Sequence, residues 1–331
     1  MRKILIVIAA AVMMACSLTA CAPAKTGEAG SEDNIQVVTT IFPVYDWVVN
    51  ILGENPGNAE VTMLLDNGVD LHSYQPTADD ILKISECDVF IYVGGESDEW
   101  VEGALAEATN KDMIVINLLE VLGDDVKEEE LVEGMEGEEE GEEGEEGEEE
   151  EGPEYDEHVW LSLKNASVLV DAIADSIASA DKANADTYIA NAEAYIGKLD
   201  ALDKEYEEAV ASAEVDTVLF GDRFPFRYLV DDYGLSYYAA FVGCSAETEA
   251  SFETIIFLAG KVDELSLNVI LKIEGDDQSI AETIRDNTAS GGQQILTMDS
   301  MQATTSEDVA NGTTYLSVME GNLDVLKEAL K

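Results

Sequence analysis

The stretch Asp70-Leu71-His72-Ser73-Tyr74-Gln75-Pro76-Thr77 holds one of only two histidines in a chain of 331 residues. The other histidine lies in Asp156-Glu157-His158-Val159-Trp160-Leu161. Neutral imidazole is the commonest metal ligand in proteins, and neighbouring carboxylates supply further ligands or orient the ring. A single histidine is more often a surface or capping residue. Two histidines, each beside carboxylates in turn-like sequence, favour metal binding.

Predicted strands and helices alternate on both sides of this first stretch. In the first half we predict strands at 35–40, 61–65, 89–93 and 113–117, and helices at 45–52, 81–85 and 100–108. This alternation is typical of an α/β domain with a mostly parallel sheet. Ligands of such sheets lie at the carboxyl ends of the strands, and the His72 loop follows a predicted strand.

The same alternation returns in the second half. We predict strands at 215–220, 237–242, 269–273 and 295–298, and helices at 226–232, 252–265, 280–288 and 318–330. Each half is large enough for its own core, so the length favours two α/β domains. Asp222, Glu274 and Asp299 each follow a predicted strand. The positional argument that marks His72 therefore marks these three carboxylates as candidate site residues.

Two predicted helices, at 165–178 and 183–211, separate the halves. In the second helix apolar residues recur at steps of three and four positions: Tyr188, Ala192, Tyr195, Ile196, Leu199, Leu202 and Tyr206. This period predicts one long amphipathic helix, and its aromatic residues indicate packing rather than ligand binding. We assign an N-terminal lobe to 35–180, a rigid linking helix to 181–213 and a C-terminal lobe to 214–331.

The N-terminus has the pattern of an export signal. Arg2 and Lys3 precede an apolar run at 4–14, which ends in Leu18-Thr19-Ala20-Cys21. These four residues resemble the lipobox of bacterial lipoproteins. We predict a signal peptide at 1–20, lipid attachment at Cys21 and a tether at 21–34, which would anchor an extracytoplasmic protein to the cell membrane. The alternative is an ordinary secretory signal that contains a cysteine.

The formal net charge of −54 excludes nucleic acid as a partner and favours cations. Between residues 124 and 157 the chain has 21 acidic residues and one lysine, Lys127. Like charges at this density do not pack, so we predict a disordered acidic loop. Its role is either that of a linker or that of a low-affinity collector of cations beside His158.

Two cysteines, Cys87 and Cys244, remain outside the signal region. Export permits a disulfide between them, but nothing in the sequence places them together. Their apolar surroundings favour buried free thiols. Glu157 beside His158 is a candidate general base, yet the chain lacks a His-Glu-x-x-His pattern, a nucleophile elbow, a phosphate loop and a dinucleotide fingerprint. We therefore do not expect an enzyme; a zinc-dependent hydrolase and a surface adhesin are the alternatives.

Several motifs, in order, resemble the zinc- and manganese-binding lipoproteins that serve ABC importers. They are Thr40-Ile41-Phe42-Pro43, the two histidine stretches, Asn191-Ala192-Glu193-Ala194-Tyr195, Tyr233-Gly234-Leu235 and Asp299-Ser300, and the resemblance spans about 35–331. It implies two α/β lobes joined by one rigid helix, with the metal in the cleft between the lobes. It also implies His72 and His158 as first-lobe ligands and Asp299 as a second-lobe ligand.

One position departs from this family pattern. Where family members have a ligating histidine or glutamate, the chain has Arg223, which stays protonated and has no lone pair to donate. Asp222 is one residue earlier and is the candidate substitute, and Glu247 and Glu249 are further candidates. Arg223 itself would pair with a carboxylate or bind an anion.

The resemblance predicts a monomeric receptor that captures Zn²⁺ and hands it to an ABC permease. The acidic loop stands where zinc-specific members carry a His- and acid-rich loop, which favours zinc, although here the loop has no histidine before His158. The Irving–Williams order also favours zinc over manganese. A manganese receptor of the same family is the alternative, because two imidazoles and two carboxylates suit both metals.

Overall fold

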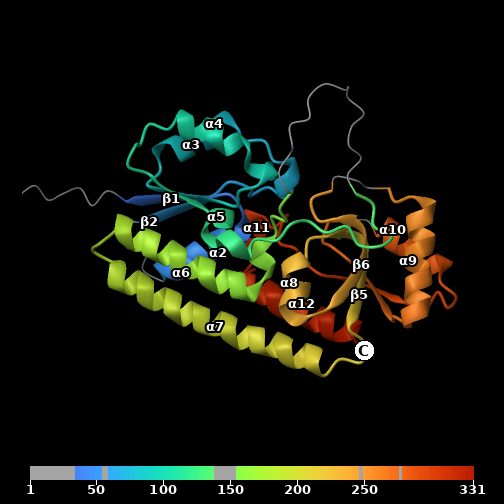
Figure 1. Ribbon diagram of the computed structural model, residues 1–331. Helices are drawn as coiled ribbons and strands as arrows, with labels where there is room; N and C mark the ends of the chain where they lie inside the picture. Colours follow the sequence, from blue (N-terminus) through green and yellow to red (C-terminus); the bar gives the residue numbers. More distant parts are fainter. Residues whose placement is uncertain (1–33, 54–58, 138–153, 246–248, 276–277) are drawn as a thin grey trace, which may run out of the picture. The chain divides into compact units, whose positions relative to one another are not determined.

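The computed structural model describes residues 34–53, 59–137, 154–245, 249–275 and 278–331 (Figure 1). The predicted signal peptide at 1–20, Cys21, nearly all of the tether, residues 138–153 and Glu247 lie outside this part of the chain. Residues 35–331 form one compact unit. Within the described part, no helix is at once long enough and apolar enough to span a bilayer.

The first lobe contains a four-stranded sheet in the order β2-β1-β3-β4, with every pair parallel. Its strands are β1 (Ile35–Thr39), β2 (Ala59–Met63), β3 (Val89–Tyr92) and β4 (Ile114–Asn117), and its helices are α2 (Phe42–Leu52), α3 (Ala78–Glu86), α4 (Trp100–Ala106) and α5 (Leu118–Leu122). Thr77 begins α3 with a capping box, because its hydroxyl accepts the N–H of Asp80 and the Asp80 carboxylate accepts the N–H of Thr77.

Two helices, α6 (Leu163–Ala180) and α7 (Ala185–Ala211), follow the first lobe and pack against each other. The 27 residues of α7 span about 40 Å. Its buried residues are Tyr188, Ala192, Tyr195, Leu199, Leu202 and Tyr206, nearly the set that the sequence period predicts. This face contacts α2 of the first lobe and, in the second lobe, α8 (Arg227–Tyr233) and α12 (Tyr315–Ala329), so α7 spans both lobes (Figure 1).

The second lobe repeats the architecture of the first. Its sheet has the order β6-β5-β7-β8, again all parallel. The strands are β5 (Thr217–Phe224), β6 (Ser236–Val242), β7 (Val269–Lys272) and β8 (Gln294–Thr297), and the further helices are α9 (Phe252–Leu265), α10 (Ser279–Asn287) and α11 (Ser306–Ala310). The prediction of two α/β lobes with parallel sheets is thereby confirmed; the exact lobe boundaries stay predictions.

Both faces of the second sheet are covered, as its apolar strands require. Leu219 packs in a core with α9 and α10, whereas its neighbours Val218 and Phe220 point into the core that contains α12. That second core continues into the first lobe through α2, α6 and α7. The chain also returns to the first lobe before α12, because Ser306 N donates to Asp66 O.

One strand differs from its predicted extent in a way that matters for the site. We predict that the strand at 215–220 ends before Gly221, but β5 continues through Phe224, with an irregular register between Phe220 and Arg223. A Cβ on Gly221 would lie 2.7 Å from Ala281 Cα. Gly221 therefore permits the close approach of α10 to β5 and does not mark a turn. Asp222 consequently lies inside a strand and not in a loop.

Candidate metal centre

His72 lies in a single 3₁₀ turn, Leu71–Ser73, in the loop that follows β2. Asp70 caps this turn, because its Oδ1 accepts the backbone N–H of His72 at 3.0 Å. The ring atom Nδ1 of His72 lies 2.7 Å from Ser97 Oγ, in the loop that follows β3. This contact fixes the ring, so that Nε2 is the nitrogen left for another partner.

His158 immediately precedes a second 3₁₀ turn, Val159–Leu161, and is fully buried. Asp156 Oδ1 accepts the backbone N–H of His158 at 2.8 Å and also lies 2.9 Å from the ring atom Nδ1. Both histidines therefore follow an aspartate by two residues, and in both the aspartate caps the histidine backbone. Only Asp156 also holds the ring.

Trp160 ties the His158 turn to the C-terminal segments. Its Nε1 donates to Ser300 O at 2.8 Å, and its own carbonyl accepts the hydroxyl of Tyr315 at 2.7 Å. The Trp160 and His158 rings lie 5.3 Å apart, centroid to centroid. His158 is therefore held between the first lobe and the segment that leads into α12.

The Nε2 atoms of the two histidines face each other at hydrogen-bond distance. His72 Nε2 and His158 Nε2 are 3.2 Å apart. Two nitrogens bound to one tetrahedral Zn²⁺ at 2.0–2.1 Å are separated by about 3.3 Å. Each ring is oriented by an oxygen on Nδ1, as is usual for metal-binding histidines. The pair has the spacing and orientation of two ligands of one metal ion.

The charges around the pair differ between the two rings. Burial and the neighbouring His158 lower the pKa of His72 to about 3. Burial also disfavours a charge on His158, but the Asp156 carboxylate, with Glu157 and Glu129, raises its pKa above the ordinary value. His72 is therefore neutral at physiological pH, and a neutral imidazole has one ring nitrogen with a lone pair for a metal ion.

Among the described residues, one group of three His, Cys, Asp or Glu side chains has donor atoms that all lie within 4.8 Å of one another: His72, His158 and Cys244. Cys87 and Cys244 are both free thiols. Cys244 lies among charged groups, in contrast to the apolar surroundings that we predict for it. The sequence argument missed this residue, although it follows a predicted strand just as His72 does.

Both carboxylate oxygens of Asp222 accept hydrogen bonds from backbone N–H groups. Its Oδ1 accepts the N–H of Arg223 at 2.8 Å and its Oδ2 accepts the N–H of Ile273 at 2.9 Å. Neither oxygen belongs to the group around the two histidines. Because β5 continues through this position, Asp222 is a buried carboxylate within the sheet, and its role as a ligand stays a prediction without support from this geometry.

Arg223 pairs with a carboxylate, which is one of the two roles that the sequence predicts for it. Its Nη2 lies 2.7 Å from Asp70 Oδ2, and its Nη1 donates to Ser245 O at 3.3 Å. One guanidinium thus contacts the loop that carries His72 and the loop that carries Cys244.

Asp299 follows β8, as predicted, but it is not in the group around the histidines. Its Oδ1 accepts the N–H of Met301 at 2.8 Å, and burial together with the nearby Glu274 raises its pKa to about 7. Glu274 accepts hydrogen bonds from the Ser300 hydroxyl and the N–H groups of Ser300 and Gln302. Glu274 therefore holds the Asp299 loop in place.

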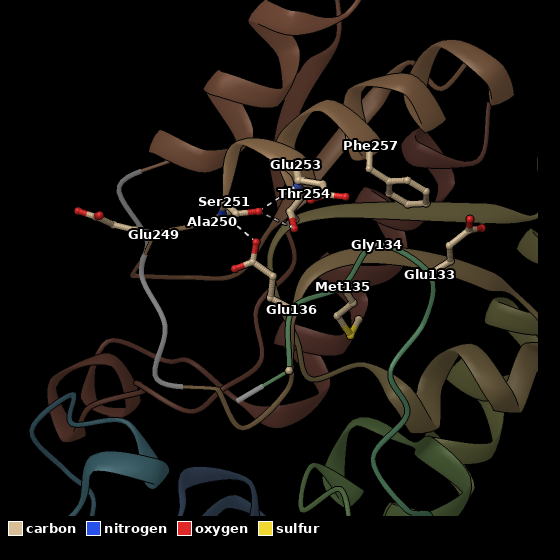
Figure 2. A pocket seen from close by; sticks show the side chains of 11 residues that line it. Glu133, Gly134, Met135, Glu136, Glu249, Ala250, Ser251, Glu253, Thr254 and Phe257 are labelled. Atoms are coloured by element: carbon tan, nitrogen blue, oxygen red, sulfur yellow. Dashed lines mark hydrogen bonds between the residues drawn. The ribbon is translucent and has the colours of Figure 1, made fainter. Parts of the chain in front are cut away.

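Glu249, another candidate ligand, lies elsewhere. Figure 2 shows it at the edge of a separate cavity of about 890 Å³ at the start of α9, which Glu133, Glu136 and Glu253 also line. Glu136 Oε1 accepts the backbone N–H of Ser251, the residue that caps α9, at 2.8 Å. This cavity lies between residues 133–137 of the acidic segment and the start of α9.

The two ends of the acidic segment are ordered, so the prediction of a disordered loop over all of 124–157 is wrong there. Glu129 N donates to Glu154 O and Asp156 N donates to Lys127 O, which pairs the two ends through one antiparallel bridge between Glu128 and Tyr155. Glu136 N donates to Ala240 O on the edge strand β6. Backbone pairing thus overcomes the charge repulsion at both ends; residues 138–153 lie outside the described part.

Two parallel α/β lobes, a helix that spans both and a buried imidazole pair define a bilobed substrate-binding protein with a site for a metal ion. The model of the family "Zinc-uptake complex component A periplasmic" (ZnuA) matches residues 37–329. The chain belongs to this family of zinc-uptake proteins.

Relatives support this assignment. The chain is 32% identical over 332 residues to the zinc-binding lipoprotein AdcA of Streptococcus pneumoniae, and this match covers 99% of the chain but only 61% of AdcA. It is 30% identical to the high-affinity zinc uptake system protein ZnuA of Bacillus subtilis, over 96% of both proteins. The crystal structure of the Zn(II)-bound ZnuA-like domain of S. pneumoniae AdcA matches with a TM-score of 0.68 and 30% identity, over 90% of this chain and 99% of that chain.

Proposed function

We propose that this protein captures Zn²⁺ outside the cytoplasm and delivers it to an ABC-type importer. The observation that carries the proposal is the pair of imidazole nitrogens 3.2 Å apart, each ring held at Nδ1 by an oxygen. The names of the relatives, a zinc-binding lipoprotein and a zinc uptake protein, agree with it.

The proposed ligands begin with His72 and His158, and Asp299 remains the candidate carboxylate from the second lobe. Two observations support this role for Asp299. It follows β8, and the next residue, Ser300, accepts the hydrogen bond from Trp160 Nε1 through its carbonyl. Asp222 is the weaker candidate, since both of its oxygens accept backbone N–H groups. Two imidazoles favour zinc over manganese, which prefers oxygen ligands.

We further propose that the protein is a monomeric carrier, anchored to the membrane by lipid at Cys21, with an ABC permease as its partner. The export signal and the lipobox-like residues before Cys21 support the anchor. The net charge of −54 opposes any role with nucleic acid. Labelling with radioactive palmitate in a bacterial host tests the anchor; a Cys21→Ala variant should lose the label.

The decisive experiment for the function is a competition titration. Metal-free protein from residue 32 onward is offered Zn²⁺ and Mn²⁺ together, and the bound metal is counted. We expect one tightly bound zinc that excess manganese does not displace, and we expect His72→Ala to lose most of the affinity. A preference for Mn²⁺ would show that the protein is a manganese receptor of the same family. If neither metal bound tightly, the proposal would be refuted.

A carrier, an enzyme and an adhesin that holds metal structurally are distinguished by removing the metal. A carrier has to stay folded when it releases its cargo, whereas a structural site unfolds without metal. We expect the circular dichroism spectrum of the protein to be unchanged after chelation. A catalytic zinc would also need an open position for water; we expect the zinc-loaded protein to show no hydrolase activity above that of the metal-free form.

A further inference from the structure

Cys244 reaches the histidines from the second lobe. It lies two residues after β6, a position equivalent to that of the His72 loop after β2, because both follow the carboxyl end of a parallel strand. Its Sγ and a ring nitrogen of each histidine lie within 4.8 Å of one another. A nitrogen and a sulfur on one tetrahedral Zn²⁺ are separated by about 3.6 Å, so only a small closure would complete this geometry.

A cavity of about 240 Å³ lies beside two of these three residues. His72, Cys244 and Glu157 all line it. The Glu157 side chain is only 2% exposed, and its Oε2 has no hydrogen-bond partner among the described residues. A buried carboxylate oxygen without a donor is costly unless a cation or a proton lies nearby. His72 Nδ1 lies 3.6 Å from this oxygen, too far for a hydrogen bond, so the carboxylate adds a negative potential that favours a cation in the cavity.

The chain has a glycine where the cysteine loop touches His158. A Cβ on Gly243 would lie 3.0 Å from His158 Cε1 and 3.0 Å from Phe224 O. Only glycine lets the backbone come this close to the ring without a shift of the loop. The contact sets the position of the next residue, Cys244, relative to the imidazole.

We propose that Cys244 is the second-lobe ligand that completes the zinc site with His72 and His158, in place of the ligand that Arg223 has replaced at the end of β5. This inference rests on the proposed zinc function and assigns the donor set of that site. Arg223 then has a positioning role, since it contacts both the Ser245 carbonyl and Asp70. A fourth position of the tetrahedron remains, and Asp299 is the candidate for it.

A thiolate changes the metal preference of the site. Soft thiolate ligands favour zinc, whereas manganese prefers carboxylate, carbonyl and water oxygens. Burial and the nearby carboxylates of Glu129, Asp156 and Glu157 raise the pKa of the Cys244 thiol well above its usual range. In the metal-free protein the thiol is therefore neutral. When Zn²⁺ binds, the S–H bond breaks, a Zn–S bond forms and the proton passes to solvent.

Cobalt reports directly on sulfur ligation. Co²⁺ occupies tetrahedral zinc sites, and a thiolate ligand gives it an intense near-ultraviolet charge-transfer band. We expect this band in the metal-loaded parent protein and in the matched control Cys87→Ser, because Cys87 is buried in the first lobe and donates to Ile84 O. We expect Cys244→Ser and Cys244→Ala to lose the band and to weaken zinc binding on the order of 100-fold.

The Cys244→Asp variant distinguishes the loss of a metal ligand from the replacement of a sulfur ligand by an oxygen ligand. It supplies an oxygen at the same place, so zinc binding should persist without the charge-transfer band, and the preference for zinc over manganese should fall. Circular dichroism of each variant shows whether it is folded. If a variant does not fold, the spectrum of the parent protein still decides.

The outcomes for Cys244 and for the zinc function are distinguishable. Tight zinc binding by the parent, with no charge-transfer band and no loss of affinity in Cys244→Ser, would overturn the role of Cys244 and leave the zinc function intact. No tight zinc in the parent would overturn both. A band that is lost in Cys244→Ser and kept in Cys87→Ser would establish the ligand.

Discussion

Arg223 in the second lobe forms an ion pair with Asp70 in the first lobe, with 2.7 Å between Nη2 and Oδ2. Asp70 uses its other oxygen to cap the backbone of His72. The same guanidinium donates to Ser245 O, one residue after Cys244. A single side chain therefore couples the loops that carry two of the proposed zinc ligands, which Arg achieves because its donors form a rigid fork.

Replacing Arg223 tests this coupling. Arg223→Ala should weaken zinc binding roughly tenfold, an effect typical of residues that orient ligands. The two side chains of the ion pair are 19% and 23% exposed, so solvent screens the pair and unfolding free energy should fall by about 1 kcal/mol or less. Chelator competition and urea unfolding measure the two effects.

Two control variants accompany Arg223→Ala. Arg223→Lys keeps the charge but lacks the fork that contacts Asp70 and Ser245 together, so its zinc affinity should be intermediate. Arg285→Ala removes a partly exposed arginine that, among the described residues, pairs with Glu282 and Asp286 of its own helix, and zinc affinity should not change. Unaltered affinity in Arg223→Ala would show that the two loops hold their positions without it.

Asp156 is the residue to change in order to test how His158 is held. Asp156→Asn keeps an oxygen for the His158 N–H but is a weaker acceptor for Nδ1. We expect zinc affinity to fall by about 10- to 100-fold, as for other carboxylates that hold a metal-binding histidine. Isothermal titration of the metal-free variant measures this. The exposed Asp171→Asn on α6 is the control, and equal affinities in the two variants would count against the orienting role.

The sequence predicts the lobes well because their signals are local. The β-branched run at 35–40 and the spacing of Tyr188, Ala192 and Tyr195 each report on one element, and the structure has β1 and α7 there. The Asp-x-His pattern at His72 and His158 is also local, since each aspartate caps a backbone two residues away. These features need no knowledge of the other lobe.

The second-lobe side of the site was less predictable because it depends on contacts between distant elements. Gly221 resembles a strand end in sequence, yet it is required by the approach of Ala281 on α10, and this places Asp222 inside β5. Cys244 follows a predicted strand, but nothing local shows that its sulfur lies near rings 172 and 86 positions away. Contacts with distant residues hold it there: Arg223 bridges Asp70 and Ser245, Gly243 packs on His158, and the Cys244 N–H donates to Glu129 Oε1.

Gly243 provides a test of that packing. Gly243→Ala puts a methyl group 3.0 Å from His158 Cε1 and 3.0 Å from Phe224 O, so the loop or the ring has to move. We expect a loss of about 1–3 kcal/mol in unfolding free energy, as for other overpacked sites. Zinc affinity should fall as well, because the shift separates Cys244 from His158. Urea unfolding and chelator competition are the measurements.

The matched control for this variant is Gly197→Ala. Gly197 is exposed in the middle of α7, and a Cβ there would meet nothing within 4 Å. Alanine should therefore stabilise the helix by about 0.5–1 kcal/mol and leave zinc binding unchanged. If Gly243→Ala behaved like Gly197→Ala, the loop would have room that the structure does not show.

The last prediction concerns how stability depends on pH away from the metal centre. Asp46 is buried in α2, where its Oδ2 accepts the Tyr195 hydroxyl of α7 and the Asn50 amide, each at 3.1 Å. Burial raises the pKa of Asp46 from 3.8 to about 6. Between these two values the folded protein binds more protons than the unfolded chain, so stability falls as the pH rises through this window.

Asp46→Asn removes this dependence, because the amide does not ionise and still accepts the Tyr195 hydroxyl. Relative to the parent, the metal-free variant should gain stability as the pH rises from about 4 to about 6, by at most about 3 kcal/mol. Urea unfolding at several pH values measures the difference, and Asp186→Asn, an exposed carboxylate in the first turn of α7, is the control. If the stability difference between Asp46→Asn and the parent stayed constant from about pH 4 to about pH 6, Asp46 would be ionised over this range in the folded protein. The contact between α2 and α7 would then contain a carboxylate and not a carboxylic acid.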